Sequence, residues 1–101
     1  MQPMFVKKRR IVDQEILEHY RNRPCDICCK RAPSDPSHIK TVRTGGDDAH
    51  WNLTSMCREC HTTWHQIGIS SFFLRHPHFE ILLKQKGWSW DGKSLIYSKV
   101  V

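Results

Sequence analysis

The sequence has 101 residues, with 16 Lys and Arg against 10 Asp and Glu and a formal net charge of +6. That length fits a single domain, whose small core would gain stability from a bound metal ion. No apolar run reaches the roughly 18 residues that span a bilayer, and no apolar stretch follows the N-terminal charges as in a secretory signal. We therefore expect no membrane partner, a cytoplasmic location, and an anionic partner of which nucleic acid is the first choice.

The N-terminal part is predicted to be a basic arm over residues 1–12, followed by a single domain over residues 13–101. Asp13 is placed to cap a helix over about residues 14–21, where Ile16, Leu17 and Tyr20 share one face.

The rest of the chain alternates short strand and helix patterns, which predicts an α+β fold. Strands are expected at 38–42 and 51–56, with a turn signal, Gly-Gly-Asp-Asp, between them. A helix is expected over about 58–66, a second over 70–86 that Pro77 interrupts, and a terminal hairpin with arms at 88–90 and 95–97.

Five cysteines are present, and four of them form two C-x-x-C pairs, Cys25 with Cys28 and Cys57 with Cys60. Zinc prefers four tetrahedral ligands, and four thiolates close a structural site with no open position. We predict that this four-cysteine zinc site stabilises the domain; buried free cysteines or a redox pair are the alternatives. Cys29 is expected to be a bystander thiol beside the site, or less simply a ligand in place of one of the four.

Two of the seven histidines, His61 and His65, are four residues apart on the predicted helix that begins at the second cysteine pair. Their rings project from one face and can share one metal ion, although two solvated helix histidines have the same spacing. His19, His76 and His78 are expected to be surface or otherwise satisfied residues.

The ordered set of motifs between residues 25 and 65 resembles the HNH endonuclease family, in particular small phage and bacterial members with cysteine knuckles. The motifs are the two cysteine pairs, Ser37-His38-Ile39, Gly45-Gly46, Trp51-Asn52-Leu53 and His61-x-x-x-His65.

This resemblance implies a ββα-metal core (the His-Me finger) over 25–65 with flanking helices, and a C-terminal helix and hairpin over 70–99. His38 is implied as the general base, Asn52 as the brace of the hairpin loop, and His61 and His65 as ligands of a catalytic Mg²⁺, Mn²⁺, Ni²⁺ or Zn²⁺. A histidine can accept a proton from water near neutral pH, and a bound cation stabilises charge on a phosphate.

One position departs from the family pattern. Many members place Asp or His directly before the general base, where it also binds the ion, but this sequence has Ser37. A hydroxyl is a weaker ligand than a carboxylate or imidazole, so water, a substrate phosphate or Asp35 would have to complete the shell.

The expected activity is hydrolysis of DNA phosphodiester bonds, by nicking or double-strand cleavage. The resemblance implies DNA as partner, phage packaging or restriction proteins as further candidates, and a bacterial host cell if the protein is phage-encoded. Contacts with the DNA backbone are predicted for the basic residues Lys7, Lys8, Arg9, Arg10, Lys40 and Arg43, with a solvated tail as the alternative for the run at residues 7–10. Two rival interpretations are a zinc-stabilised nucleic-acid-binding module without catalysis and a zinc scaffold for protein partners.

The tryptophans are expected to pack in the core or hairpin.

Overall fold

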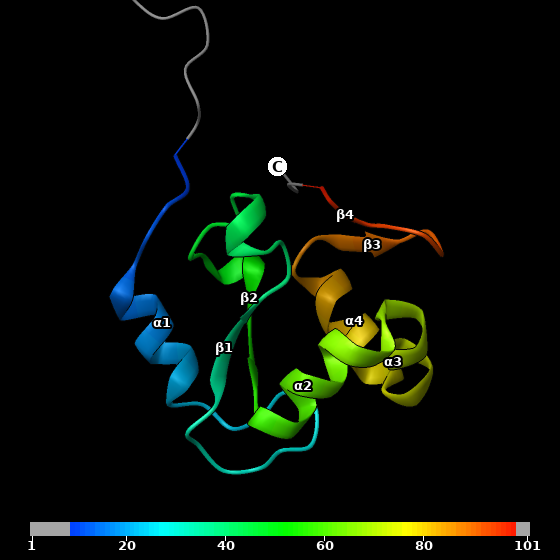
Figure 1. The fold of residues 1–101 in the computed structure, drawn as a ribbon, viewed down its shortest axis with the longest axis horizontal. Coiled ribbons are helices and arrows are strands. Elements are labelled where there is room, and N and C mark those ends of the chain that lie inside the picture. The colour runs from blue at the N-terminus through cyan, green and yellow to red at the C-terminus, as the bar shows by residue number, and fades with distance from the viewer. Residues whose placement is uncertain (1–8, 99–101) are drawn as a thin grey trace, which may run out of the picture.

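The computed structural model describes residues 9–98, which form four α-helices and two small antiparallel sheets (Figure 1). The α+β class is therefore confirmed. No helix in the described part of the chain is long and apolar enough to cross a membrane. The helices are α1 (Gln14–Arg21), α2 (Arg58–Ile67), α3 (Ile69–Arg75) and α4 (Pro77–Gln85), and the strands are β1 (Asp35–His38), β2 (Leu53–Met56), β3 (Trp88–Trp90) and β4 (Leu95–Tyr97).

The β1–β2 sheet lies between α1 on one side and α2 on the other (Figure 1). The strands are antiparallel, with Asp35 opposite Met56 and His38 opposite Leu53. Side chains alternate along a strand, so Asp35 and Ser37 share one face while His38 lies on the other. Met56 belongs to the core that α2 helps to form, so the face of Asp35 and Ser37 is the one toward α2.

The prediction of strands at 38–42 and 51–56 is wrong in its boundaries. The first strand ends at His38, because both backbone groups of Lys40 bond to the Asn52 side chain instead of to a neighbouring strand. The second strand begins at Leu53, because residues 50–52 form a 3₁₀ turn. Another 3₁₀ turn, over residues 42–44, follows Lys40 and shortens the hairpin loop.

The first helix begins as predicted. The Asp13 carboxylate accepts hydrogen bonds from the backbone N–H groups of Glu15 and Ile16, at 3.1 and 3.2 Å. These bonds satisfy two of the free amides at the start of α1. Its last turn is fixed to the sheet, because the Ser55 hydroxyl donates to the Tyr20 carbonyl at 2.7 Å.

Residues just before α1 are tied to the β1–β2 loop. The Asp48 amide donates to the Ile11 carbonyl at 2.8 Å, and the Ile11 amide donates to the Asp47 carboxylate at 2.7 Å. The end of the predicted arm, residues 10–12, is therefore part of the folded domain. Residues 1–8 of that arm lie outside the described residues.

The C-terminal half packs around an aromatic core. Instead of one interrupted helix over 70–86, there are two, and Pro77 opens the second, where its missing N–H costs no hydrogen bond. Trp64 of α2 packs edge-on against Phe72 of α3, with ring centroids 5.1 Å apart, and against Phe79 of α4, with ring centroids 5.4 Å apart. The hairpin predicted at 88–97 is confirmed as β3 and β4.

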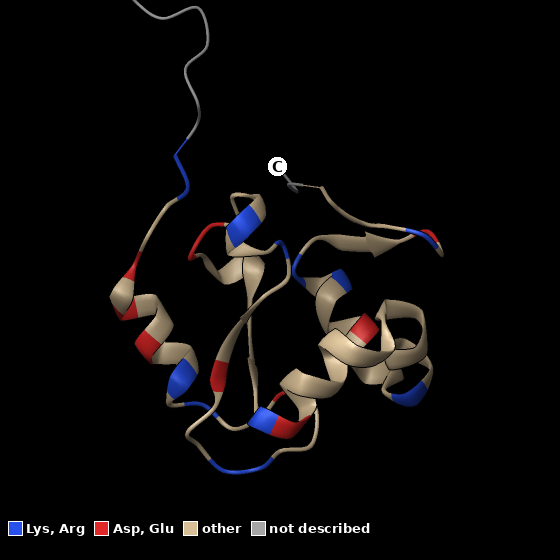
Figure 2. Cartoon of the chain, in the orientation of Figure 1, with Lys and Arg blue, Asp and Glu red and all other residues tan. Residues whose placement is uncertain are grey.

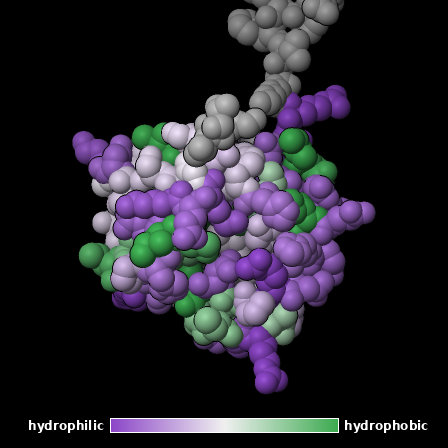
Figure 3. Space-filling model, turned by 180° about the vertical axis from the view of Figure 1, so that it is seen from behind, coloured by the Kyte–Doolittle hydropathy of each residue, from purple (hydrophilic) through white to green (hydrophobic). Residues whose placement is uncertain are grey.

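The outer faces of the short helices remain open to solvent. Leu74 and Ile81 are 82% and 57% exposed, so these two apolar side chains lie outside the core. Only the inner faces of α3 and α4 are covered, through Phe73 and Leu83 among others. Seen from behind, the surface of the molecule is mostly hydrophilic, with separate apolar patches (Figure 3).

Candidate active site

The four predicted zinc ligands come together at the start of α2. The sulfur atoms of Cys25, Cys28, Cys57 and Cys60 all lie within 4.8 Å of one another, and those of Cys28 and Cys57 are 3.7 Å apart. A tetrahedral zinc with Zn–S bonds of about 2.3 Å places its sulfurs about 3.8 Å apart. The described residues therefore contain a four-cysteine cluster compatible with a structural metal such as zinc.

The acid–base state of the cluster favours a cation. Burial raises the pKa of Cys25, but hydrogen bonds from backbone amides, including that of Ile27, outweigh it and bring the pKa to about 7. At Cys60, burial and the neighbouring sulfurs raise the pKa above its ordinary value. A bound divalent ion would favour the ionised form of its thiolate ligands, including Cys60.

Cys29 lies outside this cluster. It follows Cys28 in a left-handed conformation, with a φ of 64°, and its side chain is exposed. Its amide donates to the Cys25 carbonyl at 3.0 Å, which closes the turn of the knuckle. The residue thus serves the turn through its backbone, as expected of a bystander thiol.

The two helix histidines meet through their ring nitrogens. Nε2 of His65 lies 3.1 Å from Nε2 of His61, near the separation of about 3.3 Å expected for two tetrahedral zinc ligands. Nδ1 of His61 lies 3.1 Å from the Asp35 carboxylate, which fixes the proton on Nδ1 and leaves Nε2 free. Burial and the neighbouring His61 also lower the pKa of His65, which favours the neutral form of the His65 ring. The two Nε2 atoms are thus close enough together to share a cation, and Asp35 orients the His61 ring through Nδ1.

A hollow of about 170 Å³ joins these histidines to His38. It is lined by Pro36, His38, Thr41, Val42, His61 and His65, so residues from β1, the following loop and α2 share one pocket. His38 is the last residue of β1 and shares its strand face with Pro36, which also lines the pocket. The three histidines, from β1 and α2, thus line one cavity.

His38 is held by a buried carboxylate that the sequence analysis missed. Its Nε2 lies 2.7 Å from Oδ1 of Asp48, which also accepts from the Arg10 guanidinium at 2.9 Å. Oδ2 of Asp48 accepts from the Asp13 amide at 2.9 Å. Burial alone would raise the pKa of Asp48, but these hydrogen bonds outweigh it and hold the pKa below its usual range. The ionised carboxylate selects the His38 tautomer with its proton on Nε2, which leaves Nδ1 as an acceptor.

Asn52 fixes the loop that follows β1. Its side chain is fully buried; Oδ1 accepts from the Lys40 amide at 2.7 Å, and Nδ2 donates to the Lys40 and Asp47 carbonyls, each at 3.0 Å. Gly46 makes this clamp sterically feasible, because a Cβ there would lie 1.8 Å from the Lys40 carbonyl oxygen. Asn52 thus fixes the loop through three side-chain hydrogen bonds, while its part in catalysis stays a prediction.

Ser37 does not line the histidine pocket. Its side chain is fully buried, and neither its hydroxyl nor that of Thr54, its partner across the sheet, has a hydrogen-bond partner among the described residues. Ser37 is therefore not among the residues placed to bind an ion in the histidine pocket.

The residues predicted to contact DNA are only partly described. Lys7 and Lys8 lie outside the described residues, whereas Arg9, Lys40 and Arg43 are exposed near the β1–β2 loop. Arg10 is engaged with Asp48 and the Gly46 carbonyl. Figure 2 shows basic residues on several elements rather than on a single face.

No family model, curated protein or solved structure matches this chain. What the structure provides is a small α+β domain with a four-cysteine cluster that can hold a metal such as zinc, together with a pocket lined by His38, His61 and His65.

Proposed function

We propose that this protein is a metal-dependent DNA endonuclease of the HNH type, with a ββα-metal core formed by β1, β2 and α2. The observation that carries the proposal is the convergence of His38, His61 and His65 on one pocket, next to the helix that the four-cysteine cluster anchors. Only a fold that brings β1 against α2 joins these residues. Their chemistry, an acid–base group next to two free imidazoles, suits phosphodiester hydrolysis.

His61 and His65 would hold the catalytic ion, Mg²⁺, Mn²⁺, Ni²⁺ or Zn²⁺, through their Nε2 atoms. When bound, the ion supplies positive charge against the scissile phosphate and the leaving oxygen. Asp35 keeps the proton of His61 on Nδ1, so that Nε2 presents its lone pair. Water or the substrate phosphate would have to supply the remaining ligands, since Ser37 does not line the pocket.

His38 acts as the general base. With Nε2 bonded to Asp48, the free Nδ1 accepts a proton from a water molecule. The water oxygen then forms a bond to phosphorus while the bond from phosphorus to the 3′ oxygen breaks, and the family resemblance implies 5′-phosphate and 3′-hydroxyl products. The fixed Asp48 carboxylate stabilises the His38 ring as it becomes positively charged.

DNA is held by backbone contacts. Lys40, Arg43 and Arg9 are exposed around the loop that Asn52 braces, and the first two lie close to His38 in the chain. Such cations neutralise phosphates without reading bases, so binding should weaken steeply as salt rises and vary little with sequence.

A binding module without catalysis is the second candidate, and one observation favours it. The position that carries an ion ligand in many HNH proteins is Ser37 here, and its hydroxyl is buried away from the pocket.

The two functions separate in a plasmid assay. Zinc-loaded protein is incubated with supercoiled plasmid in added Mg²⁺, Mn²⁺ or Ni²⁺, with omission of the added ion as the control. We expect ion-dependent conversion to nicked or linear DNA. DNA binding with no cleavage under any of these ions would support the binding module, and absence of both would exclude both functions.

A further inference from the structure

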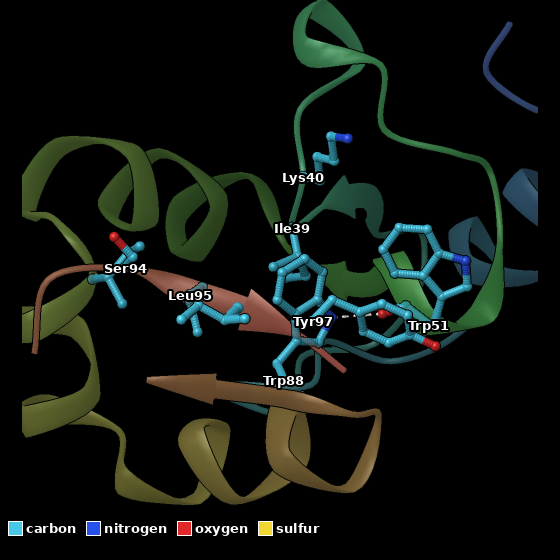
Figure 4. A pocket seen from close by; sticks show the side chains of 9 residues that line it. Ile39, Lys40, Trp51, Trp88, Ser94, Leu95 and Tyr97 are labelled. Carbon is cyan, nitrogen blue, oxygen red and sulfur yellow. Dashed lines mark hydrogen bonds between the residues drawn. The ribbon is translucent and has the colours of Figure 1, made fainter. Parts of the chain in front are cut away.

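A larger cavity, separate from the histidine pocket, lies between the β1–β2 loop and the C-terminal hairpin (Figure 4). Its volume is about 690 Å³, within the range of pockets that bind small organic groups. The lining is aromatic and aliphatic apart from one lysine and one serine, and it comprises Ile39, Lys40, Trp51, Ile69, Trp88, Ser94, Leu95, Ile96 and Tyr97.

The aromatic wall of this cavity is held in place. The rings of Trp51 and Tyr97 stack, with centroids 4.3 Å apart and planes 28° from parallel. The indole N–H of Trp88 donates to the Trp51 carbonyl at 2.7 Å, the bond drawn as a dashed line in Figure 4. Trp51 and Tyr97 are both only half-buried, so this wall has accessible aromatic surface.

Positive charge lies at the edge of the cavity. Lys40 is exposed at the end of the lining next to the β1–β2 loop (Figure 4). Lys40 and Trp51 also line a second hollow of about 240 Å³, to which Arg9 contributes. One cation, Lys40, thus lies at the edge of the apolar aromatic cavity, and a second, Arg9, lies in the adjoining hollow, which Asp47 also lines. This arrangement complements a ligand with a flat apolar part and an adjoining anion at Lys40. A nucleotide has this combination, whereas a purely apolar ligand would leave the cations unused.

The cavity is coupled to the candidate active site through the backbone. Lys40 is two residues after His38, and Asn52 clamps both backbone groups of Lys40. Trp51 directly precedes Asn52 in the chain. A nucleotide whose phosphate lies at Lys40 would therefore be close to the phosphate that is attacked by the water molecule that His38 deprotonates.

We propose that this cavity binds an unstacked nucleobase of the DNA strand next to the phosphate that is cut, with the base against Trp51 and Tyr97 and its phosphate at Lys40. This inference rests on the proposed nuclease function and names its substrate class, single-stranded or locally unpaired DNA. A base inside a duplex is stacked and paired and cannot enter such a cavity without being extruded, whereas an unpaired base enters at little cost. Stacking on aromatic side chains tolerates every base, so no sequence preference follows from it.

The test measures binding without cleavage, so that its failure is distinct from failure of the proposed function. A short single-stranded oligonucleotide carrying 2-aminopurine, and a duplex of the same length, are titrated into the full zinc-loaded chain with no added divalent ion. We expect tighter binding of the single strand, with a change in 2-aminopurine fluorescence as the base leaves its neighbours.

Two exposed positions allow variants that spare the core. Ser94→Glu places a carboxylate in the cavity lining, and Lys40→Ala removes its cation; each should weaken single-strand binding about tenfold. Ser71→Glu is the matched control, because it makes the same charge change at an exposed position of α3 that does not line the cavity.

The outcomes separate the claims. Equal affinity for single strand and duplex, or equal effects of Ser94→Glu and Ser71→Glu, would overturn the nucleobase inference even if plasmid is cleaved. Selective loss with Ser94→Glu in a protein that cleaves nothing would support the nucleobase site and reject only the nuclease. A peptide-binding cavity would give no change in 2-aminopurine fluorescence, which also overturns the inference.

Discussion

Replacement of Asp48 by Asn keeps the shape of this buried side chain but removes its charge. Oδ1 bonds to His38 and Arg10, and Oδ2 bonds to the Asp13 amide. Asn has a single carbonyl oxygen. Either the donors at Oδ1 (His38 and Arg10) or the donor at Oδ2 (the Asp13 amide) therefore loses its acceptor and faces an NH₂ group instead. A hydrogen bond to a charged group contributes about 1.5–3 kcal/mol, and the share of Arg10 is smaller because its side chain is partly exposed. We expect Asp48→Asn to lower the free energy of unfolding by about 2–3 kcal/mol.

The assay is urea unfolding of zinc-loaded protein at about pH 7, followed by tryptophan fluorescence. Because the pKa of Asp48 is lowered in the folded state, the stability from its carboxylate is present at neutral pH and is lost as the pH falls through the folded-state pKa. Asp47→Asn is the matched control: Asp47 accepts only the Ile11 amide among its described side-chain hydrogen bonds, and Asn can keep that bond, so the loss should be under about 1 kcal/mol. Equal unfolding midpoints for the two variants would refute the claim that the buried network stabilises the loop.

Three further changes test the metal sites and the loop. Cys57→Ser should abolish zinc binding and unfold the chain or sharply lower its melting temperature, whereas Cys29→Ser should keep the zinc; elemental analysis and thermal denaturation decide, and zinc retained by Cys57→Ser would count against the site. Gly46→Ala would place its Cβ 1.8 Å from a backbone carbonyl oxygen and should cost about 2–4 kcal/mol in urea unfolding; wild-type stability would mean that the loop is looser than described. Asp35→Asn should weaken Ni²⁺ or Mn²⁺ binding at the helix histidines about 10–100-fold in calorimetric titration, and unchanged affinity would remove Asp35 from its supporting role.

Local patterns in the sequence were sufficient for the metal cluster and most helices. A C-x-x-C pair has few ways to hold an ion, and two pairs in one short chain constrain each other, so the cluster of Cys25 and its partners could be predicted. The start of α1 could be predicted because the Asp13 cap acts over only three residues. The spacing of His61 and His65 fixes their rings on one helix face whatever surrounds them.

Features that depend on distant contacts could not be predicted. The first strand ends at the first residue of its predicted range, because Lys40 bonds to a side chain twelve residues away. Asp48 belongs to the Gly-Gly-Asp-Asp segment, which the sequence indicates only as a turn. Its role in holding His38 follows from its contacts with His38 and Arg10 in the folded chain. The accessible aromatic wall of the larger cavity is likewise made by residues far apart in the chain, Trp51 and Tyr97.

The central claim is that His38 performs the chemistry while His61 helps to hold the ion. The most direct measurement is the rate of plasmid nicking as a function of divalent metal concentration, for the wild type, His38→Ala and His61→Ala, each with zinc content verified. We expect His38→Ala to retain DNA binding but to cleave about 10²–10⁴-fold more slowly at every metal concentration, whereas excess metal should partly restore cleavage by His61→Ala. Wild-type cleavage by His38→Ala with every metal would contradict the account and favour the binding module.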